Sequence, residues 1–149
     1  MPKTKILMID DNIKFLELIK LNLEDTQDFE VRAETKSSLG LSAALIFKPD
    51  IIILDIVMGD QDGSSVAKQL KDNPKTQYIP IIYLIGILKE SEEHAPLGFL
   101  GQYPCISKPA STKKIIACIE NKQKSFPFLF FTGNGFINKH CFIFSKIPA

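Results

Sequence analysis

The chain has 149 residues, a formal net charge of +1 at pH 7, and ordinary shares of hydrophobic (45%) and charged (23%) residues. This length suits one domain with a short appendage, and the near-neutral charge gives no global case for binding nucleic acid or an anionic membrane. Because the sequence has no secretory apolar region, no apolar run near the roughly 20 residues that span a bilayer, and only three cysteines without Cys-x-x-Cys spacing, we expect a cytoplasmic protein with free thiols.

The first predicted strand and helix follow each other directly at the amino terminus. Residues 5–10 (Lys-Ile-Leu-Met-Ile-Asp) are a short apolar run that ends in two acids, Asp10 and Asp11. Such a run is typical of a buried strand with carboxylates at its carboxyl end. Apolar residues recur at helical spacing over residues 13–25, with charged residues between them. The side chain of Asn12 can accept a backbone hydrogen bond and cap this helix.

The next elements lead to the stretch around which the chain is organised. Residues 29–35 alternate like a less buried strand, and a second helix is expected over residues 37–47, ended by Pro49. The apolar run 51–54 has no alternation, which is typical of a strand covered on both faces of a parallel sheet. Asp55 stands at its carboxyl end, the edge where open α/β sheets place ligands and chemistry. This carboxylate could be a nucleophile, a metal ligand or a cap of the following turn.

The second half of the chain continues the alternation less regularly. A third helix is predicted over residues 64–72 and a fourth buried strand over residues 80–86. A fourth helix is expected over residues 88–100 by its position in the alternation. Pro96 and Gly98 interrupt this segment, so its helical pattern is weak.

A fifth strand and helix complete the pattern. The strand is expected around residues 105–106 and is followed by Lys108, and the helix is expected over residues 111–124. Strand and helix thus alternate five times, which predicts an α/β fold with a doubly wound, five-stranded parallel sheet and right-handed crossovers.

Charged side chains follow three of the predicted strands. Asp10 and Asp11 come after the first strand, Asp55 ends the third, and Lys108 follows the fifth. Because the carboxyl ends of parallel strands share one edge of the sheet, these side chains can converge. Carboxylates at close range need a cation, oxygen ligands suit Mg²⁺, and a lysine beside them can bind a phosphoryl group. The pattern predicts a phosphoryl-transfer site.

Five short motifs in register now carry a family resemblance. They are Ile9-Asp10-Asp11, Leu54-Asp55-Ile56-Val57-Met58, Asp62-Gly63, Pro80-Ile81-Ile82 and Lys108-Pro109. In order and separation they resemble the receiver domain of two-component response regulators across about residues 3–123. The resemblance implies a flavodoxin-like (βα)5 fold and a stand-alone signalling module similar to chemotaxis regulators. It implies no enzymatic activity beyond self-phosphorylation from a phosphodonor and self-dephosphorylation.

The resemblance also implies a role for each matching residue. Asp55 would accept a phosphoryl group from the phosphohistidine of a histidine kinase or phosphotransfer protein. Asp11, Asp55 and the backbone carbonyl of Val57 would ligate Mg²⁺, with Asp10 acting through water. Lys108 would bind the phosphoryl oxygens. The bland alternative for Asp55 is a strand-end carboxylate that caps a turn.

Some positions near this expected site follow the family pattern and others depart from it. Gly86 matches a position that is usually small and, with Met58, would lie along the phosphoryl-binding loop. The family's switch hydroxyl falls on Ile85, which has none, and its switch aromatic falls on Cys105. Tyr103, two residues before Cys105, is a candidate substitute because alternate strand residues face the same side. The acceptor chemistry is therefore expected to be intact while the usual relay is altered.

Loops and the fourth helix differ as well. Gly59 stands where the family often has a proline, which loosens the loop after Asp55. Pro96 interrupts the helix that forms part of the face by which receivers usually bind targets. Asp60 and Asp62 are interpreted as turn residues rather than ligands.

Residues 1–124 are predicted to form the receiver domain and residues 125–149 a separate extension. The extension holds seven of the eleven phenylalanines, and residues 132–135 (Thr-Gly-Asn-Gly) are typical of a hairpin turn. We interpret it as a candidate β-hairpin or interaction tail that packs on the receiver, mediates homodimerisation or partner docking, or remains from a truncated output region. It is too short for a DNA-binding or catalytic output domain.

Three functional hypotheses follow. The first is a phosphoacceptor that signals through protein–protein contacts to a downstream target that the sequence does not name. The second is a phosphorylation-independent receiver-like binding module, suggested by Ile85 and Cys105. The third is a phosphohydrolase with an aspartyl nucleophile; it ranks last because such enzymes need a second acid two residues after the nucleophile, where this chain has Val57.

Overall fold

The computed structural model describes residues 2–59, 62–86, 98–100, 103–108 and 110–131. The chain divides into two compact units, Met1–Thr112 and Lys113–Ala149, and each is considered by itself. None of the helices in these described ranges is both long and apolar enough to cross a membrane.

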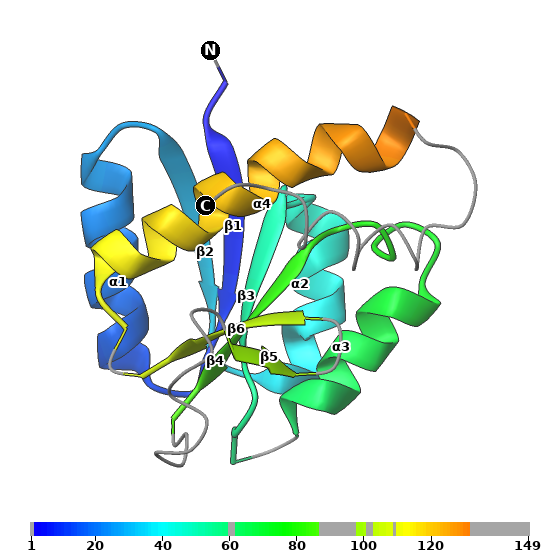
Figure 1. Ribbon diagram of the computed structural model, residues 1–149. Coiled ribbons are helices and arrows are strands. Elements are labelled where there is room, and N and C mark those ends of the chain that lie inside the picture. The colour runs from blue at the N-terminus through cyan, green and yellow to red at the C-terminus, as the bar shows by residue number, and fades with distance from the viewer. Residues whose placement is uncertain (1, 60–61, 87–97, 101–102, 109, 132–149) are drawn as a thin grey trace. The chain divides into compact units, whose positions relative to one another are not determined.

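The first unit is built around a six-stranded sheet with the order β2-β1-β3-β4-β6-β5 (Figure 1). Its parallel strands are β1 (Thr4–Ile9), β2 (Phe29–Glu34), β3 (Ile51–Asp55), β4 (Ile81–Ile85) and β6 (Tyr103–Ser107). The short strand β5 (Gly98–Leu100) pairs with β6 in the antiparallel direction at the sheet edge. The five parallel strands confirm the predicted sheet.

Two helices of this unit begin at the capping side chains that the sequence offers. α1 (Ile13–Asp25) begins after Asn12, whose side chain accepts a hydrogen bond from the N–H of Phe15 at 3.1 Å. α2 (Gly40–Phe47) follows a 3-10 turn, η1 (Ser37–Leu39), and α3 (Gly63–Asp72) is capped by the side chain of Asp62. The predicted helix over residues 37–47 is therefore a 3-10 turn followed by an α-helix.

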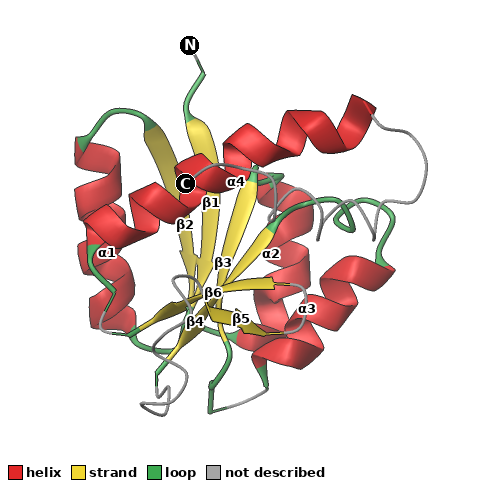
Figure 2. Cartoon of the chain, in the orientation of Figure 1, coloured by secondary structure: helices red, strands yellow, loops and turns green. Residues whose placement is uncertain are grey.

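Two apolar layers hold the sheet between the helices. β3 is buried at all of its positions, as a central parallel strand must be. On one face, side chains from α2 and α3 pack against the central strands; the group includes Ala43, Ala44, Val66, Ala67, Leu70, Leu7, Ile9, Ile52 and Leu54. α1 buries Leu16, Ile19 and Leu23 and lies on the other side of the sheet (Figure 2). The doubly wound arrangement is confirmed within this unit.

One predicted helix is partly wrong. The segment 88–100 was expected to be helical by position, but Gly98–Leu100 is strand β5, hydrogen-bonded to β6 with Phe99 opposite Pro104. Residues 87–97 lie outside the described residues. The glycine at the start of β5 and the poor helical pattern before it explain why position alone misled.

The last helix is longer than predicted. α4 (Thr112–Phe131) continues past Lys124 through the first apolar run of the extension, so that run is helical and not the first arm of a hairpin. The turn at residues 132–135 and everything after it lie outside the described residues. The division at residue 124 and the role of the extension therefore remain predictions.

Candidate functional site

The predicted site residues come together at the carboxyl edge of the sheet. Asp10 directly follows β1, Asp55 is the last residue of β3, and Lys108 directly follows β6. β1 and β3 are neighbours in parallel register, with Ile9 opposite Leu54, so their acids emerge side by side. β6 reaches the same edge through β4, and the N–H of Lys108 donates to the carbonyl of Ile85 at 2.7 Å.

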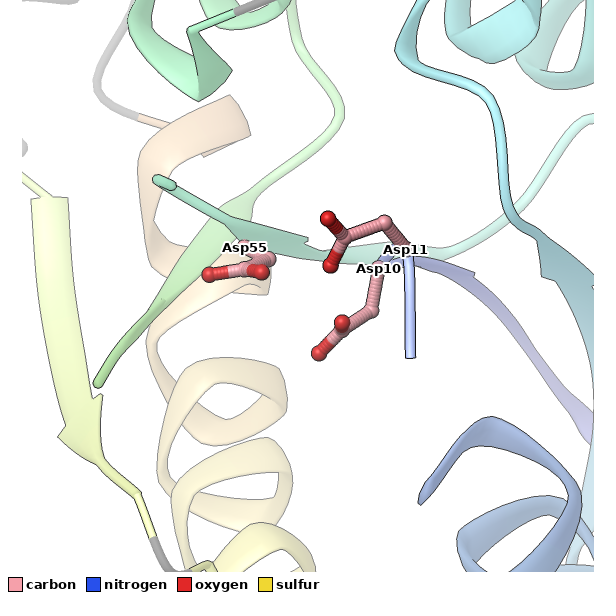
Figure 3. Close-up of side chains that lie close together, drawn as sticks. All are labelled: Asp10, Asp11 and Asp55. Atoms are coloured by element: carbon pink, nitrogen blue, oxygen red, sulfur yellow. The ribbon is translucent and has the colours of Figure 1, made fainter. Parts of the chain in front are cut away.

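Three carboxylates form the acidic half of the site (Figure 3). One oxygen from each of Asp10, Asp11 and Asp55 lies within 4.8 Å of the others. Asp10 is fully buried and Asp55 is 3% exposed, whereas Asp11 is open to solvent. Three like charges at this range repel strongly in a partly dry environment, so the cluster needs positive charge.

Backbone amides orient each acid. Asp10 Oδ1 accepts from the N–H of Asn12 at 2.9 Å, and Asp55 Oδ1 accepts from the N–H of Val57 at 3.2 Å. Asp11 Oδ2 accepts from the N–H of Gly59 at 3.2 Å. These bonds each use one carboxylate oxygen and leave the second to face the other charged groups.

Lys108 provides the positive half of the site. Its Nζ lies 2.6 Å from Asp10 Oδ2 and 3.4 Å from Asp55 Oδ2, and its side chain is 23% exposed. The same ammonium lies 5.2 Å from the centre of the Phe15 ring, a cation–π distance. In this state the lysine is closer to Asp10 than to the acid proposed to react.

The pKa values of Asp55 and Lys108 are both raised in this site. Burial raises the pKa of Asp55 from 3.8 to about 6, and the charge of Asp10 adds to this effect, whereas Lys108 and the N–H of Val57 oppose it. Burial alone would lower the pKa of Lys108, but the carboxylates of Asp10 and Asp55 outweigh burial and raise it. Two buried acids compete for one ammonium.

The donor atoms fit a hard divalent cation. All three acids offer oxygen, the ligand type that Mg²⁺ prefers. Asp10 Oδ2 is buried and, among the described residues, has no hydrogen bond of acceptable geometry, although the ammonium of Lys108 is close enough to form an ion pair. The ion pair with Lys108 offsets the cost of burying this oxygen, and a divalent cation with its bound water could take the same role.

The loop after β3 approaches the site through its backbone. A Cβ at Gly63 would clash with the carbonyl oxygen of Asp55, so only glycine fits there. The N–H of Gly63 donates to the carbonyl of Ile56 at 2.8 Å and closes the loop. Met58 is buried within the loop, whereas the side chain of Val57 is 72% exposed. The Asp-Gly pair in the sequence is thus explained by a cap and a close backbone contact.

The atypical positions lie near the site but contribute no hydroxyl. Ile85 is half-buried and packs against the core, and Cys105 is buried in that core opposite Tyr83. Gly86 faces open space, because a Cβ there would meet no atom within 4 Å. Tyr103 lies in β6 opposite Leu100, and its side chain lies outside the described part.

Sequence reasoning missed Phe15. An aromatic residue in the first turn of α1 has the spacing of a core position, and nothing in the sequence indicates that its ring lies beside Lys108. The helix start at Asn12, which does follow from the sequence, is what brings this first turn to the acidic pair.

The model of the response regulator receiver domain family matches residues 6–135 of the chain. The chain belongs to this family. It is a receiver domain of the kind found in response regulators of two-component systems, and receiver domains are generally signalling modules rather than enzymes.

Relatives of this receiver domain occur in proteins of different sizes. A probable cyclic di-GMP phosphodiesterase of Vibrio cholerae is 34% identical over 107 residues, which are 71% of this chain and 23% of that protein. The nisin biosynthesis regulatory protein NisR of Lactococcus lactis is 33% identical over 80% of this chain and 50% of its own length. The polar-differentiation response regulator DivK of Brucella anthropi is 30% identical over 81% of this chain and 96% of its own. The chain therefore spans half or less of the first two relatives and nearly all of DivK.

Solved structures share the fold. The chemotaxis protein CheY4 of Vibrio cholerae superposes with a TM-score of 0.67 at 19% identity, covering 80% of this chain and 98% of CheY4. A putative response regulator from Chloroflexus aurantiacus gives a TM-score of 0.66 at 22% identity, over 80% of this chain and 97% of its own.

Proposed function

We propose that this receiver domain accepts a phosphoryl group on Asp55 from the phosphohistidine of a histidine kinase or phosphotransfer protein. The observation that carries the proposal is the position of Asp55, with its Oδ2 3.4 Å from Lys108 Nζ and its carboxylate in a cluster with Asp10 and Asp11. A buried acid beside a lysine at the carboxyl edge of an α/β sheet is suited to act as a nucleophile toward phosphorus.

The proposed chemistry is a transfer between two carriers. A carboxylate oxygen of Asp55 forms a bond to phosphorus while the phosphorus–nitrogen bond of the donor histidine breaks, and the imidazole leaves with the electron pair and takes up a proton. The product is an acyl phosphate on Asp55. Lys108 Nζ is 3.4 Å from Asp55 Oδ2, so it could bind an oxygen of the phosphoryl group once that group is attached to Asp55.

The same residues would hold Mg²⁺. Asp11 and Asp55 would ligate the ion with the carbonyl of Val57, and Asp10 would act through water, in keeping with the oxygen-only donor set. When bound, the ion supplies positive charge against the phosphoryl oxygens. Without it, Lys108 alone must offset two buried acids.

Signalling is proposed to occur through contacts with a downstream protein, in the cytoplasm, and homodimerisation remains one route. Ile85 cannot supply a hydroxyl to a phosphoryl group, so its relay would differ from the family pattern. The binding-only alternative has less support, because a module that is never phosphorylated does not require Asp10, Asp55 and Lys108 to lie together. A phosphohydrolase is the least supported reading, since the side chain of Val57 offers no second acid.

Intact-mass spectrometry tests the proposal. The chain is incubated with Mg²⁺ and a small acyl-phosphate donor, beside Asp55→Asn and the exposed-acid control Asp72→Asn. We expect one added phosphoryl group in the wild type and in Asp72→Asn, none in Asp55→Asn, and none when Mg²⁺ is chelated. Equal labelling of Asp55→Asn would move the acceptor elsewhere, and no labelling of the wild type would favour a binding module.

A further inference from the structure

Among the described residues, one backbone hydrogen bond joins the loop after β3 to Asp11. The N–H of Gly59 donates to Asp11 Oδ2 at 3.2 Å, although the two residues are far apart in sequence. A proline at this position, which is common in the family, has no N–H and could not form this bond. The bond therefore requires a residue other than proline at position 59.

Asp11 is the cluster member that most needs a restraint. Asp10 and Asp55 are fixed by burial and by the hydrogen bonds of their own strand ends, whereas Asp11 is exposed. Repulsion from the other two carboxylates would turn an unrestrained Asp11 side chain toward solvent. Among the described residues, the Gly59 amide is the donor that holds it within 4.8 Å of Asp10 and Asp55.

The hydrogen bond leaves Asp11 able to bind a cation. It occupies a lone pair of Oδ2, and the described residues donate no hydrogen bond to Oδ1. A carboxylate has roughly four lone-pair directions, so one amide contact still leaves capacity for a metal ion. An acid that is already in place loses less conformational freedom when the ion binds, which raises affinity.

We infer that the Gly59 amide is a positioning group that holds Asp11 in the acidic cluster and so strengthens binding of a divalent cation. This inference rests on the proposed function, since it assumes that Asp11 is a metal ligand. It assigns to the loop backbone a task that a proline at this position could not perform.

The chain offers a matched pair of variants. Gly59→Ala keeps the N–H, and its Cβ would lie 3.9 Å from Asp11 Oδ2, which is ordinary contact. Gly59→Pro removes the N–H at the same position. Both variants stiffen the loop relative to glycine, and proline stiffens it more. A weaker affinity of Gly59→Pro than of Gly59→Ala therefore cannot come from added flexibility and reports the lost N–H.

Mg²⁺ affinity is measured by isothermal titration calorimetry on metal-free protein without any phosphodonor. We expect the dissociation constant of Gly59→Pro to rise about 3- to 10-fold, which corresponds to the loss of one hydrogen bond to a charged acceptor. We expect Gly59→Ala to remain within about 2-fold of the wild type, since its amide is retained. Melting temperatures in chelator check that both variants fold.

The outcomes separate the inference from the proposed function. If the wild type binds Mg²⁺ but the two variants have equal affinities, or Gly59→Pro binds more tightly, the positioning role is wrong and the site itself stands. If the wild type does not bind Mg²⁺, the metal part of the proposed function fails as well.

A second measurement applies if Gly59→Pro does not fold. In metal-free protein, amide exchange of Gly59 is followed by NMR in the wild type and in Asp11→Ala, with the Gly86 amide at the same sheet edge as the control for lost charge. We expect exchange at Gly59 to accelerate by more than about 5-fold and exchange at Gly86 to change little. Equal acceleration at both glycines would overturn the inference.

Discussion

The two ends of the parallel sheet bury charge in opposite ways. At the amino end, lysines bind backbone carbonyls: Lys71 Nζ donates to Gln77 O at 2.9 Å and Ile79 O at 3.4 Å, and Lys5 Nζ donates to Phe47 O at 3.1 Å. At the carboxyl end, Lys108 faces the acids Asp10 and Asp55. The lysine contacts described at the amino end are with neutral carbonyls, whereas among the described residues the carboxyl end holds three acids beside Lys108.

The polar contacts at the amino end stabilise the fold, whereas the charged groups at the carboxyl end form the candidate site. Around Lys71 the α3–β4 loop is closed by satisfied hydrogen bonds, including Thr76 Oγ1 to Leu70 O at 2.6 Å. Such bonds are what a buried loop needs to fold. At the carboxyl end, Asp10 Oδ2 instead depends on its ion pair with Lys108, and burial raises the pKa of Asp55 to about 6. Two buried acids that share one ammonium are an arrangement often found at functional sites, and the carboxyl end is therefore the candidate site.

Replacing Lys108 should change the unfolding free energy more than any other substitution at the two ends of the sheet. Lys108→Met leaves two buried carboxylates without their counter-charge, and we expect the metal-free protein at neutral pH to lose about 3 kcal/mol of unfolding free energy. Lys68→Met is the matched control, because Lys68 pairs with Asp72 at the same 2.6 Å but the two side chains are 76% and 63% exposed. That exposed pair should contribute at most about 0.5 kcal/mol.

Urea unfolding monitored by circular dichroism measures both variants in chelator and then in Mg²⁺. A bound cation should restore much of the stability lost in Lys108→Met, because it supplies the missing positive charge. Equal losses for the two lysine variants would mean that burial of the acids does not make Lys108 special.

Neutralising Asp55 should stabilise the metal-free protein, whereas replacing Lys108 should destabilise it. Its pKa is raised from 3.8 to about 6, so the folded state binds more protons than the unfolded state between these values, and the unfolding free energy falls as pH rises across this window. Asp55→Asn removes that penalty. We expect the variant to be more stable than metal-free wild type by about 1.5 kcal/mol at pH 7, after allowance for solvent screening, and similar to it at pH 4.

Thermal or urea unfolding between pH 4 and pH 7 in chelator checks this sign. Asp62→Asn is the control, since Asp62 is exposed and asparagine caps a helix about as well as aspartate. Saturating Mg²⁺ should stabilise the wild type more than Asp55→Asn. If the wild type instead became more stable as Asp55 loses its proton, the charged carboxylate of Asp55 would not be unfavourable in the folded state.

The sequence predicted the carboxyl end better than the rest. The unbroken run before Asp55 and the acids after the first strand follow from local patterning, and strand order then forces Asp10, Asp11, Asp55 and Lys108 together. The sequence could not predict that Lys108 lies closer to Asp10 than to Asp55, because that depends on ångström distances between distant segments.

What local patterns failed to predict depends on long-range contacts. Strand β5 exists because Gly98–Leu100 pairs with β6, and its own residues carry little strand signal. Phe15 has an ordinary helix position, yet its ring lies beside Lys108. Lys71 has the sequence appearance of a solvated lysine near a helix end, and only the closed α3–β4 loop shows that it is half-buried.

Lys71 therefore supplies the smallest prediction and tests the amino end. Burial lowers its pKa from 10.5 to about 8. Between these values the unfolded state binds more protons than the folded state, so the unfolding free energy of the wild type should rise with pH. Lys71→Met lacks this proton, and the stability difference, wild type minus variant, should increase by about 1 kcal/mol between pH 7.5 and pH 9.

Urea unfolding at these two pH values measures the increase, with Lys75→Met as an exposed-lysine control from the same loop. The sign distinguishes the two ends of the sheet: a cation held by carbonyls becomes less costly as it loses its proton, whereas Asp55 becomes more costly as it loses its own. A stability difference that stays flat or falls with pH would show that Lys71 is solvated. The amino end of the sheet could then no longer be contrasted with the charged carboxyl end.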